Sequence, residues 1–304
     1  MANITAKLVA ELREKTGSGM MDCKKALVET DGDMEKAIAV LREKGLAAAA
    51  KRSGRIAAEG LVIAKVDDAK NVGVVLEVNS ETDFVAKNEQ FAEFAQAVAN
   101  TVINENPADV DALANCKLAG SDQTVAEELT NKISTIGENL KIRRFERLEG
   151  NLIAYTHGDG RIGVIVEIET DIDPSNEEVK QCGKDVALQV TAMNPQYLNK
   201  DSVPAEIIES EKEILRAQVV KEGKPEHIAD KIVMGKMSKF YKENCLLEQA
   251  FVKDGDIDVK KYVDGVASSL GGTIKIVNFV RYEKGEGLQK RDDNFADEVA
   301  EMMK

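Results

Sequence analysis

Apolar residues recur at helical spacing through the first 45 positions of the chain. Asn3 or Thr5 is suited to cap a first helix, and Asp33 is suited to cap a third helix that ends at Gly45. A short second helix lies between them. The pattern predicts a three-helix module over 1–45, followed by a helical linker over 46–59. The expected inward faces are Ile4, Leu8, Val9 and Leu12 in the first helix and Met34, Ala37, Ile38 and Leu41 in the third.

From Gly60 onward the pattern becomes that of β-strands. Two runs rich in Val, Ile and Leu, 61–66 and 72–78, flank a polar stretch at 67–71, which predicts a hairpin. A helix is expected next, because apolar residues then return at a spacing of three and four. Its inward face comprises Phe91, Phe94, Ala95, Val98 and Val102.

The same order of elements then returns. Residues 163–168 repeat 73–78 at an offset of 90, and residues 275–283 echo 141–149 at an offset of 134. A helix again follows the first repeated strand, with Val179, Cys182, Val186 and Val190 on one face. The sequence therefore predicts an α+β fold whose core is a duplicated pair of α+β subdomains with antiparallel sheets. The first copy is expected over 60–150, and the second over 151–198 and 248–284.

The change of offset predicts an insertion of 44 residues in the second copy, between its helix and its last strand. We assign it to 199–247, as a helical hairpin with Pro204 in the first turn of one helix. Gly223-Lys224-Pro225 forms the expected break between the two helices. The segment 285–304 is expected to be a short linker and a C-terminal helix carrying Phe295, Val299 and Met302.

Composition narrows the classes of function. The 304 residues carry a formal net charge of −13, which argues against a nucleic-acid partner because phosphate binding needs a clustered basic face. No window is apolar enough for a membrane span, and no hydrophobic signal region precedes the first helix. The four cysteines and two histidines show no metal-ligand spacing. We expect a cytoplasmic protein with free thiols, no metal site and no cofactor.

The motifs of common enzymes are missing from the sequence. It holds no G-x-x-x-x-G-K-[ST] phosphate loop, no dinucleotide fingerprint after a strand, no H-E-x-x-H and no G-x-S-x-G. Carboxylates are abundant, but an acid/base pair needs a cleft that shifts its pKa values, and nothing in the sequence indicates one. The prediction is that the protein is not an enzyme.

One segment, Asn79 to Asn88, lies just past a strand, where a polar loop is expected. It instead carries the apolar residues Phe84 and Val85 directly after Asp83. The simpler interpretation is that Thr82 or Asp83 caps the next helix and Phe84 packs back against it. The alternative is an exposed aromatic beside a carboxylate at a strand-to-helix tip, a shape suited to insertion into a partner. His157, in a glycine-rich turn, is expected at the corresponding tip of the second copy.

Two motifs resemble the elongation factor Ts family. They are Thr82-Asp83-Phe84-Val85-Ala86-Lys87-Asn88 and the N-terminal stretch from Thr16 to Leu27. Shorter matches follow in the family's order along essentially the whole chain: Ile136-Gly137-Glu138-Asn139, His157-Gly158, Gly223-Lys224-Pro225 and Phe279-Val280-Arg281-Tyr282.

The resemblance implies a ubiquitin-associated-like N-terminal module and a partner, the GTPase elongation factor Tu. A member of this family binds the GTPase with GDP, disturbs its Mg²⁺ and phosphate site and releases GDP during translation elongation. The helical hairpin is the expected surface for a homodimer or a 2:2 complex. The residues implied as partner contacts are Thr82, Asp83, Phe84 and Val85 at the Mg²⁺ site, with Lys24, Ile136, Gly137 and His157 in support.

Two other classes of function are weighed against this one. An adaptor could hold a ubiquitin-like partner through the N-terminal module, but it would leave the segment around Phe84 without a role. A hydrolase using clustered carboxylates would require a pocket. Release of fluorescent GDP from a GTPase distinguishes all three classes.

Overall fold

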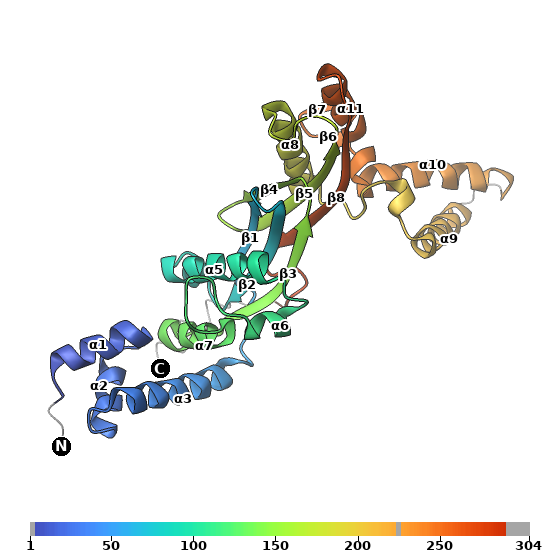
Figure 1. Ribbon diagram of the computed structural model, residues 1–304. Helices are drawn as coiled ribbons and strands as arrows, with labels where there is room; N and C mark the ends of the chain where they lie inside the picture. Colours follow the sequence, from blue (N-terminus) through green and yellow to red (C-terminus); the bar gives the residue numbers. More distant parts are fainter. Residues whose placement is uncertain (1–3, 223–225, 290–304) are drawn as a thin grey trace.

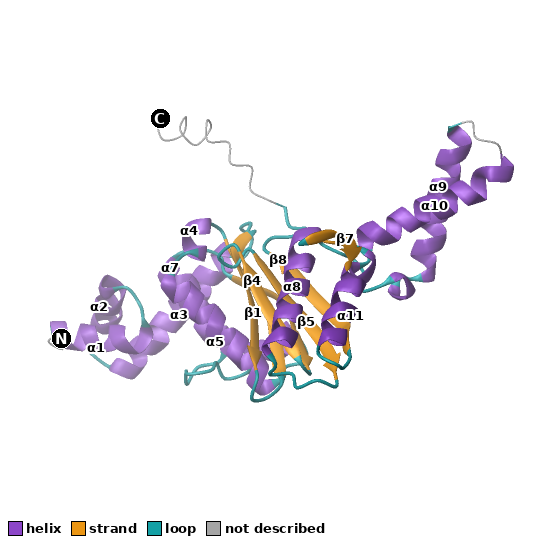
Figure 2. Ribbon diagram, turned by 90° about the horizontal axis from the view of Figure 1, so that it is seen from above, coloured by secondary structure: helices purple, strands orange, loops and turns teal. Residues whose placement is uncertain are grey.

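The structure is a computed structural model that describes residues 4–222 and 226–289. It confirms the α+β class: two small antiparallel sheets lie at the centre, with helices on their outer faces and helical extensions at both ends (Figures 1 and 2). The expected break at Gly223-Lys224-Pro225 and the expected helix with Phe295, Val299 and Met302 lie outside the described residues. No helix in 4–222 or 226–289 has the length and apolar character required to cross a membrane.

The N-terminal helices follow the predicted pattern closely at their starts. They are α1 (Ala6–Thr16), α2 (Met20–Glu29) and α3 (Met34–Arg52). The side chains of Thr5 and Asp33 accept hydrogen bonds from backbone amides and cap α1 and α3, as expected. The three helices share one apolar cluster, formed by Val9, Leu12, Cys23, Ala26, Leu27, Ala37 and Leu41.

The prediction that the third helix ends at Gly45 was wrong. Helix α3 continues through Gly45 to Arg52, so much of the expected linker is part of the same helix. A Cβ atom at Gly45 would lie 3.5 Å from the Thr130 methyl group of another helix. Gly45 therefore lies within α3, at the point where this helix packs against α7 (Val125–Ile136). A glycine in the interior of a helix costs about 1 kcal/mol of stability relative to alanine.

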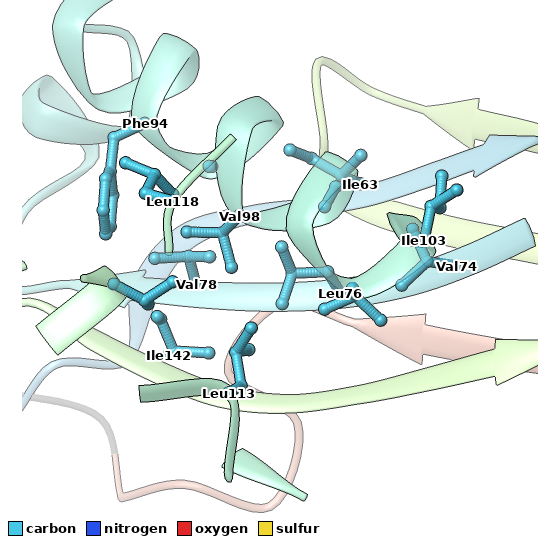
Figure 3. Packing of buried hydrophobic residues seen from close by; sticks show 14 of the residues in the cluster. Ile63, Val74, Leu76, Val78, Phe94, Val98, Ile103, Leu113, Leu118 and Ile142 are labelled. Carbon is cyan, nitrogen blue, oxygen red and sulfur yellow. The ribbon is translucent and has the colours of Figure 1, made fainter. Parts of the chain in front are cut away.

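The first sheet has the strand order β1-β2-β3, and all its pairs are antiparallel. Its strands are β1 (Glu59–Asp67), β2 (Val72–Ser80) and β3 (Lys141–Glu149). Between β2 and β3 the chain forms α4 (Asp83–Ala86), α5 (Glu89–Glu105), α6 (Val110–Asn115) and α7 (Val125–Ile136). Figure 3 shows side chains of α5, such as Phe94 and Val98, packed on Leu76 and Val78 of the sheet.

The second sheet has the order β4-β5-β8 and is also antiparallel. Its strands are β4 (Leu152–His157), β5 (Ile162–Thr170) and β8 (Ile274–Glu283). Helices α8 (Glu177–Met193) and α11 (Val259–Ser269) pack on it, and β6 (Ala250–Phe251) pairs with β7 (Asp254–Asp258) nearby.

The two sheets share their internal geometry as well as their order. The register of β5 with β8 reproduces that of β2 with β3 at the offsets of 90 and 134, and each pair is interrupted by a bulge at the same place, after Glu77 and after Glu167. The left-handed glycines Gly137 and Gly271, which follow α7 and α11, also match at 134. The duplicated order of elements is therefore present in the structure.

The sheets pack face to face through a small apolar layer. A Cβ atom at Gly163 would lie 2.6 Å from Val62, and one at Gly73 would lie 2.9 Å from Leu152 and Ile165. Gly163 is the counterpart of Gly73 at the offset of 90, and Leu152 is the counterpart of Val62. Each copy thus makes the same contact with the other, which gives the two copies an approximate two-fold relation. The layer contains Val62, Val75, Leu148, Leu152, Ile165 and Val280.

The insertion forms two packed helices that extend away from the sheets (Figure 1). They are α9 (Ala205–Lys221) and α10 (Glu226–Asn244), flanked by the 3₁₀ turns Lys200–Ser202 and Leu246–Glu248. Pro204 precedes α9 as its N-cap instead of lying inside its first turn. The helices share their own apolar cluster, formed by Leu215, Val219, Ala229, Val233 and Met237. At the root, a parallel bridge between Tyr197 and Cys245 brings both ends of the insertion together.

Candidate functional site

The segment around Phe84 forms a short projecting turn of helix at the end of β2. Thr82 caps α4, because its hydroxyl oxygen accepts a hydrogen bond from the Val85 amide at 3.4 Å. Val85 is partly buried and packs against the first core, whereas the Phe84 side chain is 80% exposed. We call residues 81–87 the tip. Its base is fixed to the core and its aromatic residue faces solvent.

A carboxylate from the other end of the first copy fastens the tip. Oε2 of Glu138 accepts hydrogen bonds from the amides of Glu81 (3.1 Å) and Thr82 (3.0 Å), and its Oε1 accepts one from the Thr82 hydroxyl (2.6 Å). In return, the Asn139 amide donates to Oε1 of Glu81 at 2.6 Å. Gly137, in the left-handed conformation after α7, turns the chain so that the next two residues reach the tip.

Glu138 was missed as a site residue. The expected support came from Ile136 and Gly137, but the polar contacts to the tip are made by the two residues that follow them. The four-residue motif was visible in the sequence. The role of the Glu138 carboxylate could not be recognised from the sequence, because the backbone amides that it binds lie more than 50 residues earlier in the chain.

The capping half of the simpler interpretation is confirmed for Thr82, whereas its alternative cap, Asp83, and the packing of Phe84 are not observed. The cap is Thr82, so Asp83 is the first residue inside the turn, and Phe84 is too exposed to pack back against the helix. The Asp83 carboxylate instead accepts a hydrogen bond from the Lys87 ammonium group, with an N–O distance of 2.7 Å. This hydrogen bond holds the pKa of Asp83 below its usual value. Asp83 therefore remains a carboxylate on the solvent side of the tip.

The turn with His157 lies beside the tip, although it does not correspond to it in the duplication. His157 ends β4, and its counterpart at the offset of 90 is Asp67, at the end of β1. The expectation of matching tips was wrong in this respect. The two-fold packing brings the turn to the same end of the molecule, since the Val62 amide of β1 donates to the Gly160 carbonyl oxygen at 2.7 Å.

Charged groups from three segments gather around the tip. The hydrogen bond with Asp83 raises the pKa of Lys87, and the nearby carboxylates of Glu59 and Asp159 raise it further. Lys284, just after β8, pairs with Glu59, and its amide donates to the Arg161 carbonyl oxygen at 2.9 Å. The tip, the turn 157–161 and the end of β8 thus form one continuous surface. Within it, the Tyr155 hydroxyl lies 3.0 Å from Nδ1 of the exposed His157.

Lys24 belongs to a different part of the molecule. It is exposed on α2, in the N-terminal module, and Figure 2 shows α2 and α4 at separate places. The structure therefore brings Thr82, Asp83, Phe84 and Val85 together with Ile136, Gly137 and the His157 turn, while Lys24 lies on a second face.

The surface is suited to binding a partner. In the part of the chain that the structure describes, no group of three or more His, Cys, Asp or Glu side chains is placed to hold a metal ion. The groove between α3 and α7, with a volume of about 410 Å³, is lined by residues such as Leu41 and Thr130 and does not include the tip. An exposed aromatic side chain on a fixed base is instead the geometry of an interface anchor.

Comparison with known proteins identifies relatives over nearly the whole chain. A family model described as "Elongation factor TS" matches residues 81–286. The protein named "Elongation factor Ts" from Clostridium perfringens (strain SM101 / Type A) is 54% identical over 302 residues, covering 98% of this chain and 99% of the relative. That of Syntrophotalea carbinolica is 50% identical over 304 residues, covering 99% of each.

Proposed function

The chain belongs to the elongation factor Ts family, and from this premise we propose that it is a guanine-nucleotide exchange factor for elongation factor Tu. It binds the GTPase with GDP and promotes GDP release without catalysing a chemical reaction itself. The observation that carries the proposal is the tip, where Phe84 is 80% exposed above a base held by Glu138.

The mechanism we infer is a wedge. A GTPase holds GDP through the backbone amides of its phosphate loop and through a bridging Mg²⁺ ion. Phe84, supported by Thr82 and Val85, enters beside that site and moves the side chains around the metal. Because the tip is already ordered before binding, little of its contact energy is lost in ordering it.

Several contacts must act together in this mechanism. Weakening GDP binding by 10⁴-fold requires about 5.5 kcal/mol of differential binding. One buried Phe side chain supplies roughly 1.5–3 kcal/mol. The remainder comes from the His157 turn and from the second face on which Lys24 lies. Since coupling is reciprocal, GDP must weaken the binding of this protein to the same extent, which allows it to leave when nucleotide returns.

The helical hairpin is proposed as a surface for self-association or for a 2:2 complex. Ile207, Ile214 and Met234 are exposed along α9 and α10, and the Met234 side chain is 74% exposed. The mass of the protein in solution, alone and with elongation factor Tu, tests this part. A variant with alanine at the three positions should then be monomeric, or form a 1:1 complex, at the same concentration.

The test of exchange is direct. Elongation factor Tu loaded with fluorescent GDP is mixed with excess unlabelled GDP, with and without the protein, and the loss of fluorescence is followed. The proposal expects release to accelerate with protein concentration and to saturate. An unchanged release rate at protein concentrations that demonstrably form the complex would refute it.

A further inference from the structure

A buried carboxylate beneath the tip is not used by the proposed wedge. Glu77 in β2 is fully buried, and its oxygens accept hydrogen bonds from four donors. These are Nη1 of Arg143 (3.0 Å), Nε of Arg144 (2.7 Å), Nδ2 of Asn79 (3.0 Å) and the amide of Gly285 (2.8 Å). We call Glu77 and the two arginines the hub.

The bulge in the first sheet explains how one carboxylate meets two arginines. Glu77 pairs with Arg144 and the next residue, Val78, pairs with Ile142, so Arg143 is the extra residue of β3. A bulge places two residues of one strand opposite one residue of its partner. Arg143 and Arg144 therefore both face Glu77, which two neighbouring residues of a regular strand, pointing to opposite sides, would not do.

The hub also reaches the turn after β8. Nη2 of Arg143 donates to the Glu286 carbonyl oxygen at 2.6 Å, and the Arg144 guanidinium lies 4.1 Å from the centre of the Tyr282 ring. Gly285 has a left-handed φ of 69°, and a Cβ atom there would lie 2.2 Å from the Ala58 carbonyl oxygen. The turn 283–287 is thus pressed against the first copy and bound there by charged groups.

The second copy has the same bulge without a hub. Its counterpart of Glu77 is Glu167, and the residues at the positions of Arg143 and Arg144 are Val277 and Asn278. The bulged sheet therefore forms without this charge cluster. Its presence in the first copy alone indicates a role other than building the sheet.

We propose that Glu77 is a positioning residue. It holds the turn 283–287, and through it the turn 157–161, in a fixed position relative to the tip. The link to the second turn is the hydrogen bond from the Lys284 amide to the Arg161 carbonyl oxygen. The link to the tip is β2 itself, which ends at Ser80. The inference rests on the proposed exchange function, because the surface that it orders is the one described above.

The chemistry of the hub supports this role. Burial alone would raise the pKa of Glu77, but the hydrogen bonds from Gly285, Asn79 and the two arginines together hold it below its usual value. The carboxylate therefore stays charged, and charge-assisted hydrogen bonds are about twice as strong as neutral ones. A neutral Gln at this position would keep the size of the side chain and lose the charge that holds the turn.

The experiment compares Glu77→Gln with Glu167→Gln, the matched change at the same bulge of the second copy. The first readout is stimulated GDP release as a function of protein concentration. For Glu77→Gln we expect the half-saturating concentration to rise about tenfold, or about 1.4 kcal/mol, with the saturated rate unchanged. A preorganised surface lowers the cost of binding, whereas the tip that acts on the nucleotide site is intact.

The second readout does not depend on exchange. Trypsin cleaves after Lys284, and the Lys284–Gly285 bond lies in the turn that the hub holds. We expect cleavage there to be faster in Glu77→Gln than in the wild type and unchanged in Glu167→Gln. If the wild type does not stimulate exchange, the proposed function fails, and this readout still decides whether the hub holds the turn.

Arg143→Met provides a second variant if Glu77→Gln does not fold. It removes the bond to the Glu286 carbonyl oxygen and leaves Arg144 to balance the buried carboxylate. The same two changes are expected, with smaller size. Folded Glu77→Gln or Arg143→Met proteins with wild-type cleavage and wild-type concentration dependence would overturn the proposal. So would equal effects from Glu167→Gln.

Discussion

Replacing Phe84 by alanine separates a role in folding from a role in binding. The side chain is 80% exposed, so folding gains little from it, and the change should alter the free energy of unfolding by no more than about 0.5 kcal/mol. If the ring becomes fully buried in the partner, the contact is worth roughly 1.5–3 kcal/mol. The corresponding loss in kcat/KM of stimulated GDP release is about 10-fold to 150-fold.

The assay combines two measurements on the same preparations. Urea unfolding followed by circular dichroism gives the free energy of unfolding, and fluorescent GDP release from elongation factor Tu gives kcat/KM. Phe91→Ala is the matched control, since Phe91 lies seven residues further on, is fully buried in the first core, and should cost about 3–5 kcal/mol of stability.

A Phe84→Ala protein that loses as much stability as Phe91→Ala would show that the ring packs in solution and would refute the reasoning. Full exchange activity in a stable Phe84→Ala protein would refute the wedge. Only wild-type stability combined with a large loss of exchange agrees with an exposed anchor on a fixed base.

Four further outcomes are expected. Deleting 202–243 with a short Gly/Ser bridge should leave cooperative unfolding and part of the exchange activity, because α9 and α10 have a separate apolar cluster and the root is bridged. Asp83→Asn should leave both the thermal midpoint and exchange nearly unchanged across a Mg²⁺ titration, since Thr82 provides the cap and the wedge needs no metal ligand. Gly163→Ala should cost about 1–3 kcal/mol of stability, because its Cβ would lie 2.6 Å from Val62. The difference in free energy of unfolding between wild type and Glu77→Gln should be largest above pH 4.5, the pKa of this carboxyl group in the unfolded chain. It should shrink as the pH falls through the lower pKa of Glu77 in the folded state.

A contradicting result or a control variant accompanies each of these outcomes. Loss of cooperative unfolding in the deletion would show that the hairpin belongs to the core, and a Mg²⁺-dependent defect in Asp83→Asn would favour direct competition for the metal. Gly265→Ala, at a helical glycine with open space around it, is the control for Gly163→Ala and should be slightly stabilising. A wild-type-to-Gln difference that grows toward low pH would contradict the lowered pKa of Glu77.

Much of the fold could be predicted because its signals are local. The apolar faces of the helices and the strand runs around residues 67–71 depend on neighbouring residues, and the two offsets revealed the duplicated order. The end assigned at Gly45 failed for the opposite reason. Glycine commonly follows the end of a helix, but α3 continues to Arg52, and Gly45 lies in ordinary contact with Thr130 of α7, which no local pattern shows.

The candidate site was predictable only in part. The tip was visible because an aromatic residue stood where a polar loop was expected. The clamp by Glu138 and the hub at Glu77 were not visible, since both join residues that are far apart in the chain. The hub further depends on a bulge, which rotates one residue of β3 and which strand patterning does not reveal.

The pairing of β5 with β8 also determines when the protein can fold during its own synthesis. The first sheet is complete in the nascent chain once Glu149 has left the ribosome, whereas β5 must wait for a partner strand more than 100 residues later. Until β8 emerges, one edge of β5 is open and the second sheet has only two strands, too few for independent stability. Such long-range pairing is slow and exposes unpaired edges to aggregation. A ribosome stalled before Ile274 therefore leaves the nascent chain with a complete first sheet and a second sheet that lacks its third strand.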